Sequence, residues 1–489
     1  MDILNLMERG KGLCQRLFKQ AQGFCARLFK QVKGFFEGLF KQGKGFYKTL
    51  FKVALPIIGA NFMQNALGLA DTFMVGQLGD NAVAAAALAN RFVFIYSLIT
   101  FGVLSGGSVL AAQYWGKKDV AAIEGVLAIA LRLTLSLGVV FSLVALTVPD
   151  YVMRIFTNVP EVITLGAGYI RIISMNFLIT GFTNVYANFI RNVEQPKLSF
   201  WVSFSVFFAN FGLNYVFIFG KLGFPAMGLN GAALGSALLA AAVLIVTLCY
   251  IKWSNPVVRV RFREIIRPNK LLMKDFFHYS GVVMINELLW GVGYSMHSII
   301  LGHISAVAVA AYSVVMSVQQ LIMAMGFGLA AAAAVMVGKV IGQNDMRKAK
   351  SQSALFYFLS VSVGVCVTFI LLLLRQLVLT DSVFKLSPDA LALARQMMLL
   401  YAFIGIASAS TCTTIVGILR AGGDTKVSML FDLVFMWFIS LPLAFAGAFW
   451  WGLSPILVMI LINAEEILKF IASTIRVFGW KWMKNVTRD

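Results

Sequence analysis

The feature that constrains this chain most is an apolar run from Leu55 to Gly79, LPIIGANFMQNALGLADTFMVGQLG. At about 1.5 Å per residue, a helix of this length crosses the hydrocarbon core of a bilayer, which is roughly 30 Å thick. Hydrophobic residues make up 60% of the 489 residues and charged residues only 13%, and the mean hydropathy is +0.83. Because this composition excludes an ordinary soluble domain, we predict an all-α polytopic membrane protein.

Twelve apolar runs of this kind follow one another along the chain. We place them at 53–75, 82–112, 126–148, 162–190, 198–220 and 229–251, and then at 276–301, 308–337, 353–374, 391–418, 428–449 and 454–478. Lys and Arg gather in alternate loops, and the richest loop, 252–274, joins the two sets of six. The positive-inside rule places these loops and both termini in the cytoplasm, and it assigns Arg191, Arg420 and Lys426 to them. The loop 375–395, on the opposite side, is an exception with three basic residues.

The two sets of six runs indicate an internal duplication with an offset of 226 residues. Without a gap, identical residues coincide at Gly76 and Gly302, Val109 and Val335, Gly116 and Gly342, and Asp119 and Asp345. We therefore predict two related halves around a shared cavity, the first at 53–252 and the second at 276–489, joined by a basic linker at 253–275.

Residues 10–53 contain four copies of an eleven-residue unit, from GKGLCQRLFKQ to GKGFYKTLFKV. Eleven residues make three helical turns, so the Leu-Phe pair of each unit stays on nearly one face of a helix with a Lys beside it. We predict that residues 1–52 form an amphipathic helix in the plane of the bilayer, bound to anionic headgroups. A helix for oligomerisation or partner binding and a flexible tail are the alternatives.

The formal net charge of +20 arises mainly in these loops and in the repeat segment, so we expect no nucleic acid partner. The five cysteines show no CxxC spacing, and three sit in apolar runs, so we expect neither a disulfide framework nor a zinc site. The sequence has no GxxxxGK[ST] motif and no nucleophile with a base at a usable spacing. We therefore expect neither cofactors nor enzymatic activity. We also expect a monomer.

Two acidic side chains lie deep in the apolar runs, Asp71 and Glu287. A carboxylate near the middle of a membrane helix costs about 2.5–3.5 kcal/mol on insertion scales, so it usually faces protein or a water-filled cavity and handles ions or protons. The alternative for both is a carboxylate paired with a neighbouring helix for packing. At the offset of 226, Asp71 coincides with His297 and Asn61 with Glu287, so the two halves place ionisable groups at different heights.

Several longer stretches carry a combination of motifs. They are the run at 55–79, GGSVLAAQYWGKKD at 106–119, RNVEQPKLS at 191–199, NFGLNYVFIFGKLGFPAMGLNGAALGSAL at 210–238, AAAVMVGKVIGQND at 332–345 and RAGGDTKVSM at 420–429. Together they resemble the bacterial multidrug and toxic compound extrusion (MATE) transporters over about 53–478, which leaves the N-terminal repeat as an addition. The resemblance implies twelve helices in two pseudo-symmetric lobes, an N-lobe and a C-lobe, and export of organic cations against protons or sodium ions.

The resemblance also implies roles for single residues. Asp71 in LADTFMVG matches the first-helix Asp that is held to take part in cation coupling, and Glu287 in NELLWGVG matches a seventh-helix acid of many bacterial members. The fifth helix departs from the family, because Asn210 and Asn214 stand where many members have an Asn and an acid. An amide cannot exchange a proton, so the coupling ion stays open between a proton and sodium, with a sodium site near Asp71 as one alternative.

Other polar residues are candidates for the cavity wall or for helix movement. The candidates for the wall are Asn61, Gln64, Asn184, Asn188, Asn210, Asn214, Trp290 and His297. Their alternative role is hydrogen bonding between helices. Pro56 is a candidate hinge of the first helix. Asp432 is expected near the interface in a pair with Lys426. Glu465 and Glu466 point about 100° apart, so we do not expect them to act as a carboxylate pair on one face, and a position of one of them toward the cavity is the alternative.

The interpretation is a secondary active multidrug exporter of the bacterial inner membrane, which moves small hydrophobic organic cations by alternating access. Within transport, the alternative is a flippase for lipid-linked substrates, which is expected to carry more cationic residues in its cavity, whereas the deep groups here are mainly acidic. A non-transporting scaffold is the alternative from another class. It would tolerate changes at Asp71 and Glu287 but not the loss of residues 1–52.

Overall fold

The computed structural model describes residues 44–253, 257–266, 269–377 and 387–488, and within these ranges the chain is helical with short connections. The chain divides into two units, Met1–Leu50 and Phe51–Asp489. Of the first unit only 44–50 is described, as helix, so most of the predicted amphipathic helix at 1–52 lies outside the described residues. The description below concerns the second unit.

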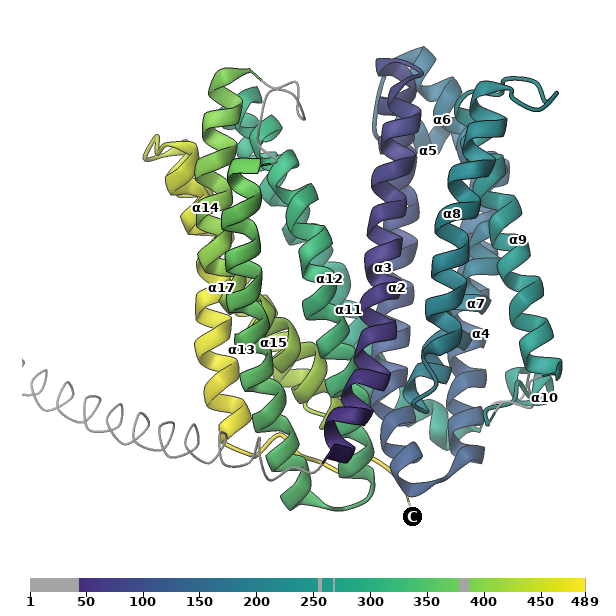
Figure 1. Ribbon diagram of the computed structural model, residues 1–489, viewed down its shortest axis with the longest axis vertical. Coiled ribbons are helices and arrows are strands. Elements are labelled where there is room, and N and C mark those ends of the chain that lie inside the picture. The colour runs from purple at the N-terminus through teal and green to yellow at the C-terminus, as the bar shows by residue number, and fades with distance from the viewer. Residues whose placement is uncertain (1–43, 254–256, 267–268, 378–386, 489) are drawn as a thin grey trace, which may run out of the picture. The chain divides into compact units, whose positions relative to one another are not determined.

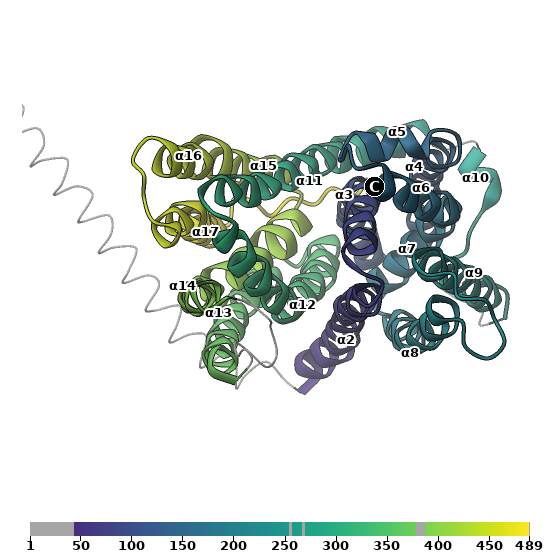
Figure 2. The same cartoon turned by 90° about the horizontal axis from the view of Figure 1, so that it is seen from above.

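The N-lobe is the first of two helical bundles, which stand side by side in Figures 1 and 2. Its helices are α2 (Lys44–Gly76), α3 (Asp80–Lys117), α4 (Val120–Thr147), α5 (Pro149–Arg154), α6 (Pro160–Ile173), α7 (Asn176–Asn192), α8 (Lys197–Phe219) and α9 (Leu229–Trp253). The helices α6 and α7 meet at an angle of 50° and form one broken span. A short helix, α10 (Phe262–Ile266), lies in the linker.

The C-lobe repeats this plan. Its helices are α11 (Lys270–Ile304), α12 (Ala306–Gly342), α13 (Met346–Leu377), α14 (Pro388–Thr411), η1 (Cys412–Leu419), α15 (Thr425–Leu433), η2 (Val434–Ser440), α16 (Leu441–Phe449) and α17 (Pro455–Phe478). The elements η1 and η2 are π-helical stretches inside longer helices, a geometry that is frequent at functional sites. Some spans consist of several elements: α6 and α7 form one broken span, and α14–η1 and α15–η2–α16 are each continuous. When each such set is counted as one span, the helices correspond to the twelve predicted runs.

Most of these helices are long and apolar enough to cross a membrane. Nine of the described helices meet this description, and the bent pair α6–α7 makes a tenth. The remaining two, α11 and α17, carry charged residues among apolar ones, and α17 alone contains Glu465, Glu466, Lys469 and Arg476. The chain is therefore a multi-pass membrane protein, and α11 and α17 are spans that each carry several charged residues.

The duplication is visible in how helices begin. At the start of α4, Asp119 accepts a hydrogen bond from the backbone N–H of Ala122 at 2.9 Å. At the start of α13, Asp345 accepts one from the backbone N–H of Lys348 at 3.0 Å. Both acceptors satisfy a backbone donor that a helix leaves free in its first turn. The two pairs are related by the same offset of 226 residues.

The lobes touch where α3 and α12 cross, and glycine makes that approach feasible. A Cβ atom on Gly116 would lie 2.0 Å from the carbonyl oxygen of Lys339, and one on Gly342 would lie 1.9 Å from the carbonyl oxygen of Gln113. At the offset of 226, Gly116 corresponds to Gly342 and Gln113 corresponds to Lys339, so the two contacts are equivalent in the two lobes. Such reciprocity is what a pseudo-two-fold axis between the lobes produces, and it confirms the predicted pair of pseudo-symmetric lobes.

A second pair of crossings follows the same rule. A Cβ atom on Gly102 of α3 would lie 2.5 Å from the Cα atom of Met284 in α11, and one on Gly328 of α12 would lie 2.2 Å from the side chain of Ile58 in α2. Met284 and Ile58 are again 226 residues apart. Each lobe thus sends its first helix against the second helix of the other lobe.

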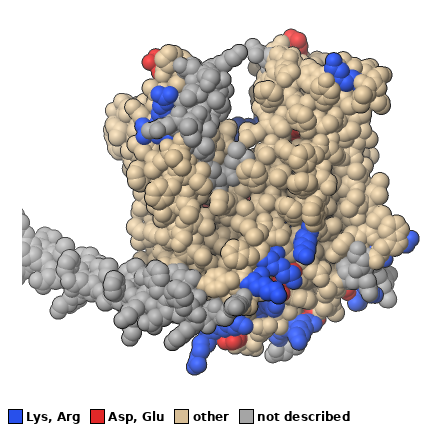
Figure 3. Space-filling model, viewed as in Figure 1, with Lys and Arg blue, Asp and Glu red and all other residues tan. Residues whose placement is uncertain are grey.

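The outer surface is apolar around the bundle, as Figure 3 shows, and large side chains face outward. Phe438 is 75% exposed, Phe73 is 72% exposed and Leu373 is 65% exposed. Lys and Arg gather mainly at one end of the view, which is the end where α3 finishes and α4 begins (Figures 1 and 3). An apolar belt with a basic rim on one side is the surface expected of a bilayer-spanning protein.

Candidate functional site

A cavity of about 940 Å³ lies between the two lobes. Its wall is formed by α2, α3, α6, α7, α8 and α9 from the N-lobe and by α11, α12, α14, η1, α15 and α17 from the C-lobe. Figure 3 shows the surface hollowed between the lobes, away from the basic end. The cavity is large enough for a drug-sized molecule.

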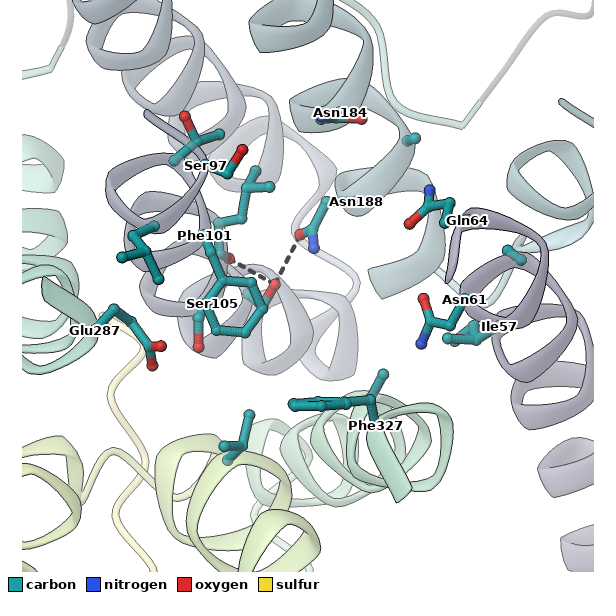
Figure 4. A pocket seen from close by; sticks show the side chains of 18 of the residues that line it. Ile57, Asn61, Gln64, Ser97, Phe101, Ser105, Asn184, Asn188, Glu287 and Phe327 are labelled. Carbon is teal, nitrogen blue, oxygen red and sulfur yellow. Dashed lines mark hydrogen bonds between the residues drawn. The ribbon is translucent and has the colours of Figure 1, made fainter. Parts of the chain in front are cut away.

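The N-lobe side of the cavity is rich in amides. Asn61 and Gln64 project from α2, and Asn184 and Asn188 project from α7 toward the same space (Figure 4). The amide oxygen of Asn188 accepts a hydrogen bond from the Ser108 hydroxyl at 2.8 Å, which holds that amide in place. The structure thus brings four of the predicted wall residues together, and aromatic rings, among them Phe101 and Phe327, complete the wall.

Glu287 lines the C-lobe side of the cavity and has a cationic partner. Its Oε1 atom lies 2.8 Å from Nη1 of Arg420, and the same Nη1 donates to the Ser105 hydroxyl at 3.0 Å. Arg420 is 2% exposed, so the prediction that places it in a cytoplasmic loop is wrong. The physical reason is that η1 extends the tenth span to Leu419, which carries Arg420 to the inner end of the cavity.

A second ion-pair group lies beside the first. The Nζ atom of Lys469, whose side chain is 2% exposed, lies 3.1 Å from Asp432 and 3.0 Å from Glu465. Asp432 also accepts a hydrogen bond from Asn286 at 2.8 Å. The expected pair of Asp432 with Lys426 is therefore wrong, because Asp432 faces α11 and α17 inside the lobe. Lys469 did not figure among the predicted residues, although its spacing of four from Glu465 in an apolar helix was a usable signal.

The groups that line the cavity carry both signs of charge. Carboxylates come from Glu287, Asp432 and Glu466, and cationic groups come from Arg191, Arg420 and Lys469. Of the two adjacent glutamates, Glu466 is the one that lines the cavity. The expectation that the deep groups are mainly acidic needs correction, because three cations line the same space. Arg191, which the positive-inside rule assigns to a loop, lies instead in the last turn of α7.

Asp71 lies in a smaller cavity of about 330 Å³ within the N-lobe. Its Oδ1 atom accepts a hydrogen bond from Nδ2 of Asn214 at 2.6 Å, and that nitrogen also donates to Asn210 at 2.9 Å. Asn210 and Asn214 are buried behind Asp71, and neither is among the described residues that line the two cavities. Both cavities are lined by Asn90, Tyr169 and Ser236, which mark where the two meet.

The remaining predicted residues lie in different settings. Trp290 lines the large cavity and stacks on Tyr294, with ring centroids 5.1 Å apart. His297 is 3% exposed, its ring lies 5.7 Å from that of Tyr294, and it is absent from the described lining of both cavities. Pro56 lies within α2, which is helical on both sides of it.

At the basic end, the lobes are joined by polar contacts. The side chain of Gln113 in α3 donates to the carbonyl oxygen of Ala421 at 2.7 Å and accepts from the backbone N–H of Val486 at 2.8 Å. Lys339 of α12 lies 2.9 Å from Glu194 in the turn after α7. These contacts close this end of the cavity, and we refer to it as the closed end.

The C-terminal tail, residues 479–488, is part of the closed end. Trp482 is fully buried, and the backbone N–H of Lys484 donates to the carbonyl oxygen of Gly422 at 3.0 Å. Arg488 reaches Asp275, with Nη2 and Oδ1 2.7 Å apart. This hydrogen bond raises the pKa of the Arg488 guanidinium above its ordinary value. The tail therefore ties the end of α17 to the beginning of α11 and to α3.

Known proteins share this architecture. A probable multidrug resistance protein NorM of Bradyrhizobium diazoefficiens is 27% identical over 413 residues, which are 83% of this chain and 87% of that protein. Another of that name, from Thermotoga maritima, is 25% identical over 448 residues, or 89% of this chain and 94% of that protein. A solved structure described as the outward-facing conformation of a multidrug resistance MATE family transporter of the MOP superfamily matches with a TM-score of 0.80 and 18% identity, over 89% of this chain and 96% of that one.

The family profile named MatE matches this sequence twice, at residues 56–216 and 283–446. The two matches fall in the N-lobe and the C-lobe, so they follow the duplication seen in the helix crossings. Because they cover well over half of the residues and agree with the resemblance found in the motifs, the chain belongs to the MatE family.

Proposed function

We propose that the protein is a secondary active multidrug exporter, which moves hydrophobic organic cations by alternating access against protons or sodium ions. The observation that carries the proposal is the cavity between the lobes, which is closed at one end and combines aromatic rings with carboxylates. The ring of Trp290 and the carboxylate of Glu466 offer a flat cation both π-contact and charge. The names of the curated relatives, probable multidrug resistance proteins, support the same function.

The basic closed end indicates the orientation. By the positive-inside rule this end faces the cytoplasm, together with both termini, so the described conformation is open to the outside. We assign the protein to a bacterial inner membrane as a monomer, with the segment 1–52 bound to anionic headgroups of the cytoplasmic leaflet.

Asp71 is the proposed exchange site for the coupling ion. Its carboxylate is backed by the amides of Asn210 and Asn214, and the buried Oδ1 of Asn214 has no hydrogen-bond partner. Carboxylate and amide oxygens suit a hard cation such as sodium, whereas a proton needs the carboxylate alone. Pro56 is the proposed hinge about which the upper part of α2, which carries Asp71, repacks when Asp71 is protonated. Unchanged α2 geometry in a proton-mimicking Asp71→Asn variant would argue against that hinge.

The experiment is uptake of a fluorescent lipophilic cation into proteoliposomes under an imposed proton gradient and, in parallel, under an imposed sodium gradient. We expect Asp71→Asn to abolish gradient-driven uptake. The matched control is Asp150→Asn, the same substitution at an exposed position at the start of α5, which should keep wild-type uptake. Uptake by the wild type under neither gradient would refute the exporter.

A flippase for lipid-linked substrates is the second candidate, and the cations in the cavity wall are the observation in its favour. Two of the three, Arg420 and Lys469, are within 3.1 Å of carboxylates, which leaves little free positive charge for an anionic headgroup. In the same wall, the buried Oε2 atom of Glu466 has no hydrogen-bond partner among the described residues, and this free carboxylate oxygen favours the exporter. Stimulation of lipid-linked pyrophosphate translocation, with no cation uptake, would reverse the preference.

A further inference from the structure

The carboxylate of Glu287 faces the cavity but is already neutralised from within the protein. Its partner Arg420 lies 2.8 Å away, in a region where both side chains are no more than 10% exposed. Asp432 on α15 and Lys469 on α17 are the other charged groups whose fields act on Glu287. A cationic substrate that binds Glu287 must therefore displace Arg420 or share the carboxylate with it.

Arg420 has few other ways to stabilise its charge. Apart from Glu287, its Nη1 atom has only the neutral hydroxyl of Ser105 as a described partner, and its buried Nε atom has no hydrogen-bond partner. A buried guanidinium without a counter-ion is strongly unfavourable. When Glu287 is taken by another cation, Arg420 therefore gains from any movement that admits water or a new anion.

We propose, on the basis of the exporter function, that Arg420 is a tethered competitor for Glu287: it displaces the organic cation in the outward-open state, and its own release loosens the closed end. Export requires a lower affinity for the organic cation in the outward-open state than in the inward-open state, because the cation must leave the binding site on the outside. The guanidinium of Arg420, as a competing cation that belongs to the protein, lowers the affinity of the outward-open state for the organic cation. The other residues of the cavity wall stay in place. Arg420 is thus a positioning residue that sets affinity through Glu287.

The second half of the proposal follows from the neighbours of Arg420. The same Nη1 atom bonds Ser105 on α3, so Arg420 spans the two lobes. The next residue, Ala421, accepts the hydrogen bond from Gln113, and the one after it, Gly422, accepts from the tail. A displacement of Arg420 therefore acts directly on the contacts that close the cytoplasmic end, so a cation or a proton on Glu287 favours opening to the inside.

The test is direct binding of tetraphenylphosphonium to purified full-length protein in detergent, in mildly alkaline buffer. We expect Arg420→Gln to bind about tenfold more tightly or better, since a free carboxylate replaces a paired one. Arg420→Lys keeps the competing charge and should bring the Kd back toward wild type. The matched control is Arg476→Gln, which breaks another ion pair of the C-lobe, with Asp424, away from the described cavity lining.

A second readout separates competition from a purely structural role. In proteoliposomes, Arg420→Gln should show a lower KM together with a lower kcat, because the substrate binds tightly and leaves slowly. If Arg420→Gln does not fold, the variant Glu287→Gln/Arg420→Gln, which removes both charges, serves in its place. We expect no tightening of its Kd relative to wild type, because no carboxylate is freed, and a tenfold tighter Kd in this variant would overturn the inference.

Unchanged or weaker binding in folded Arg420→Gln would overturn the inference, as would equal tightening in Arg476→Gln. A wild-type protein that transports no cation would overturn the exporter function itself, whereas transport with an unaltered Kd in Arg420→Gln would remove only this inference.

Discussion

Replacing Gly342 by alanine should open the closed end of the cavity. A Cβ atom at this position would lie 1.9 Å from the carbonyl oxygen of Gln113, and the reciprocal contact at Gly116 is 2.0 Å. Both obstacles are backbone atoms, so no side-chain rotation relieves the clash. The helices α3 and α12 must therefore move apart at the point where the two lobes cross.

The size of the effect follows from that overlap. Real Cβ atoms essentially never approach closer than 3.0 Å, so the backbones must separate by roughly 1 Å. Overpacking of this kind costs typically about 1–3 kcal/mol in a well-packed interior. Under the proposed alternating access, opening of the closed end separates the same helices. The cost then falls on the described conformation alone and should shift the ratio of the two states about 5- to 150-fold.

The assay is a distance measurement between spin labels at Lys197 and Lys348, exposed positions at the basic end of the N-lobe and the C-lobe, in a background without native cysteines. Gly342→Ala should populate a longer distance than wild type. The matched control is Gly281→Ala in α11, where an added Cβ atom meets nothing within 4 Å. A distance distribution for Gly342→Ala that equals that of Gly281→Ala, in a protein of unchanged melting temperature, would show that the crossing does not hold the lobes closed.

Three further predictions concern single contacts. Lys469→Met removes the cation from its buried carboxylates and should cost about 3–5 kcal/mol of stability, measured as a lower melting temperature in detergent, with partial recovery when Asp432→Asn is added. Asn214→Ala removes the 2.6 Å hydrogen bond to Asp71 and should reduce gradient-driven uptake more than melting temperature; the reverse result would make Asn214 structural. Trp482→Ala empties a fully buried site in the tail and should cost about 3–5 kcal/mol of stability. Amide exchange at residues 484–486 should become faster, and exchange at the wild-type rate would count against the tail as part of the closed end.

Sequence reasoning predicted the polar wall of the cavity better than its ion pairs. Asn61, Gln64, Asn184 and Asn188 recur on the faces of two helices, and the structure places all four in the cavity wall. Helical periodicity relates residues three or four positions apart, and that is enough to group side chains on one face. Asn210 and Asn214, one turn apart, were grouped in the same way and lie together behind Asp71.

The pairing of charges was predicted less well. The positive-inside rule assigns Arg420 to a loop because it counts basic residues near helix ends, and the rule has no information on whether the last turn of a helix is buried. Asp432 was paired with Lys426 because the two are neighbours in sequence, whereas its partner Lys469 comes from another helix. A buried ion pair depends on which helices are adjacent, and adjacency is a property of the bundle.

The amino-acid sequence by itself determined the all-helical membrane fold, the duplication and the residues that each helix places on its polar face. These follow from the length of apolar runs, from local periodicity and from the repeat, all of which act within a helix or between copies of one pattern. Only the tertiary structure decided that Glu287 faces Arg420, that Lys469 meets Asp432, and that the tail closes the basic end. Those contacts join residues from tens to several hundred positions apart, and only the packing of helices brings them within hydrogen-bonding distance.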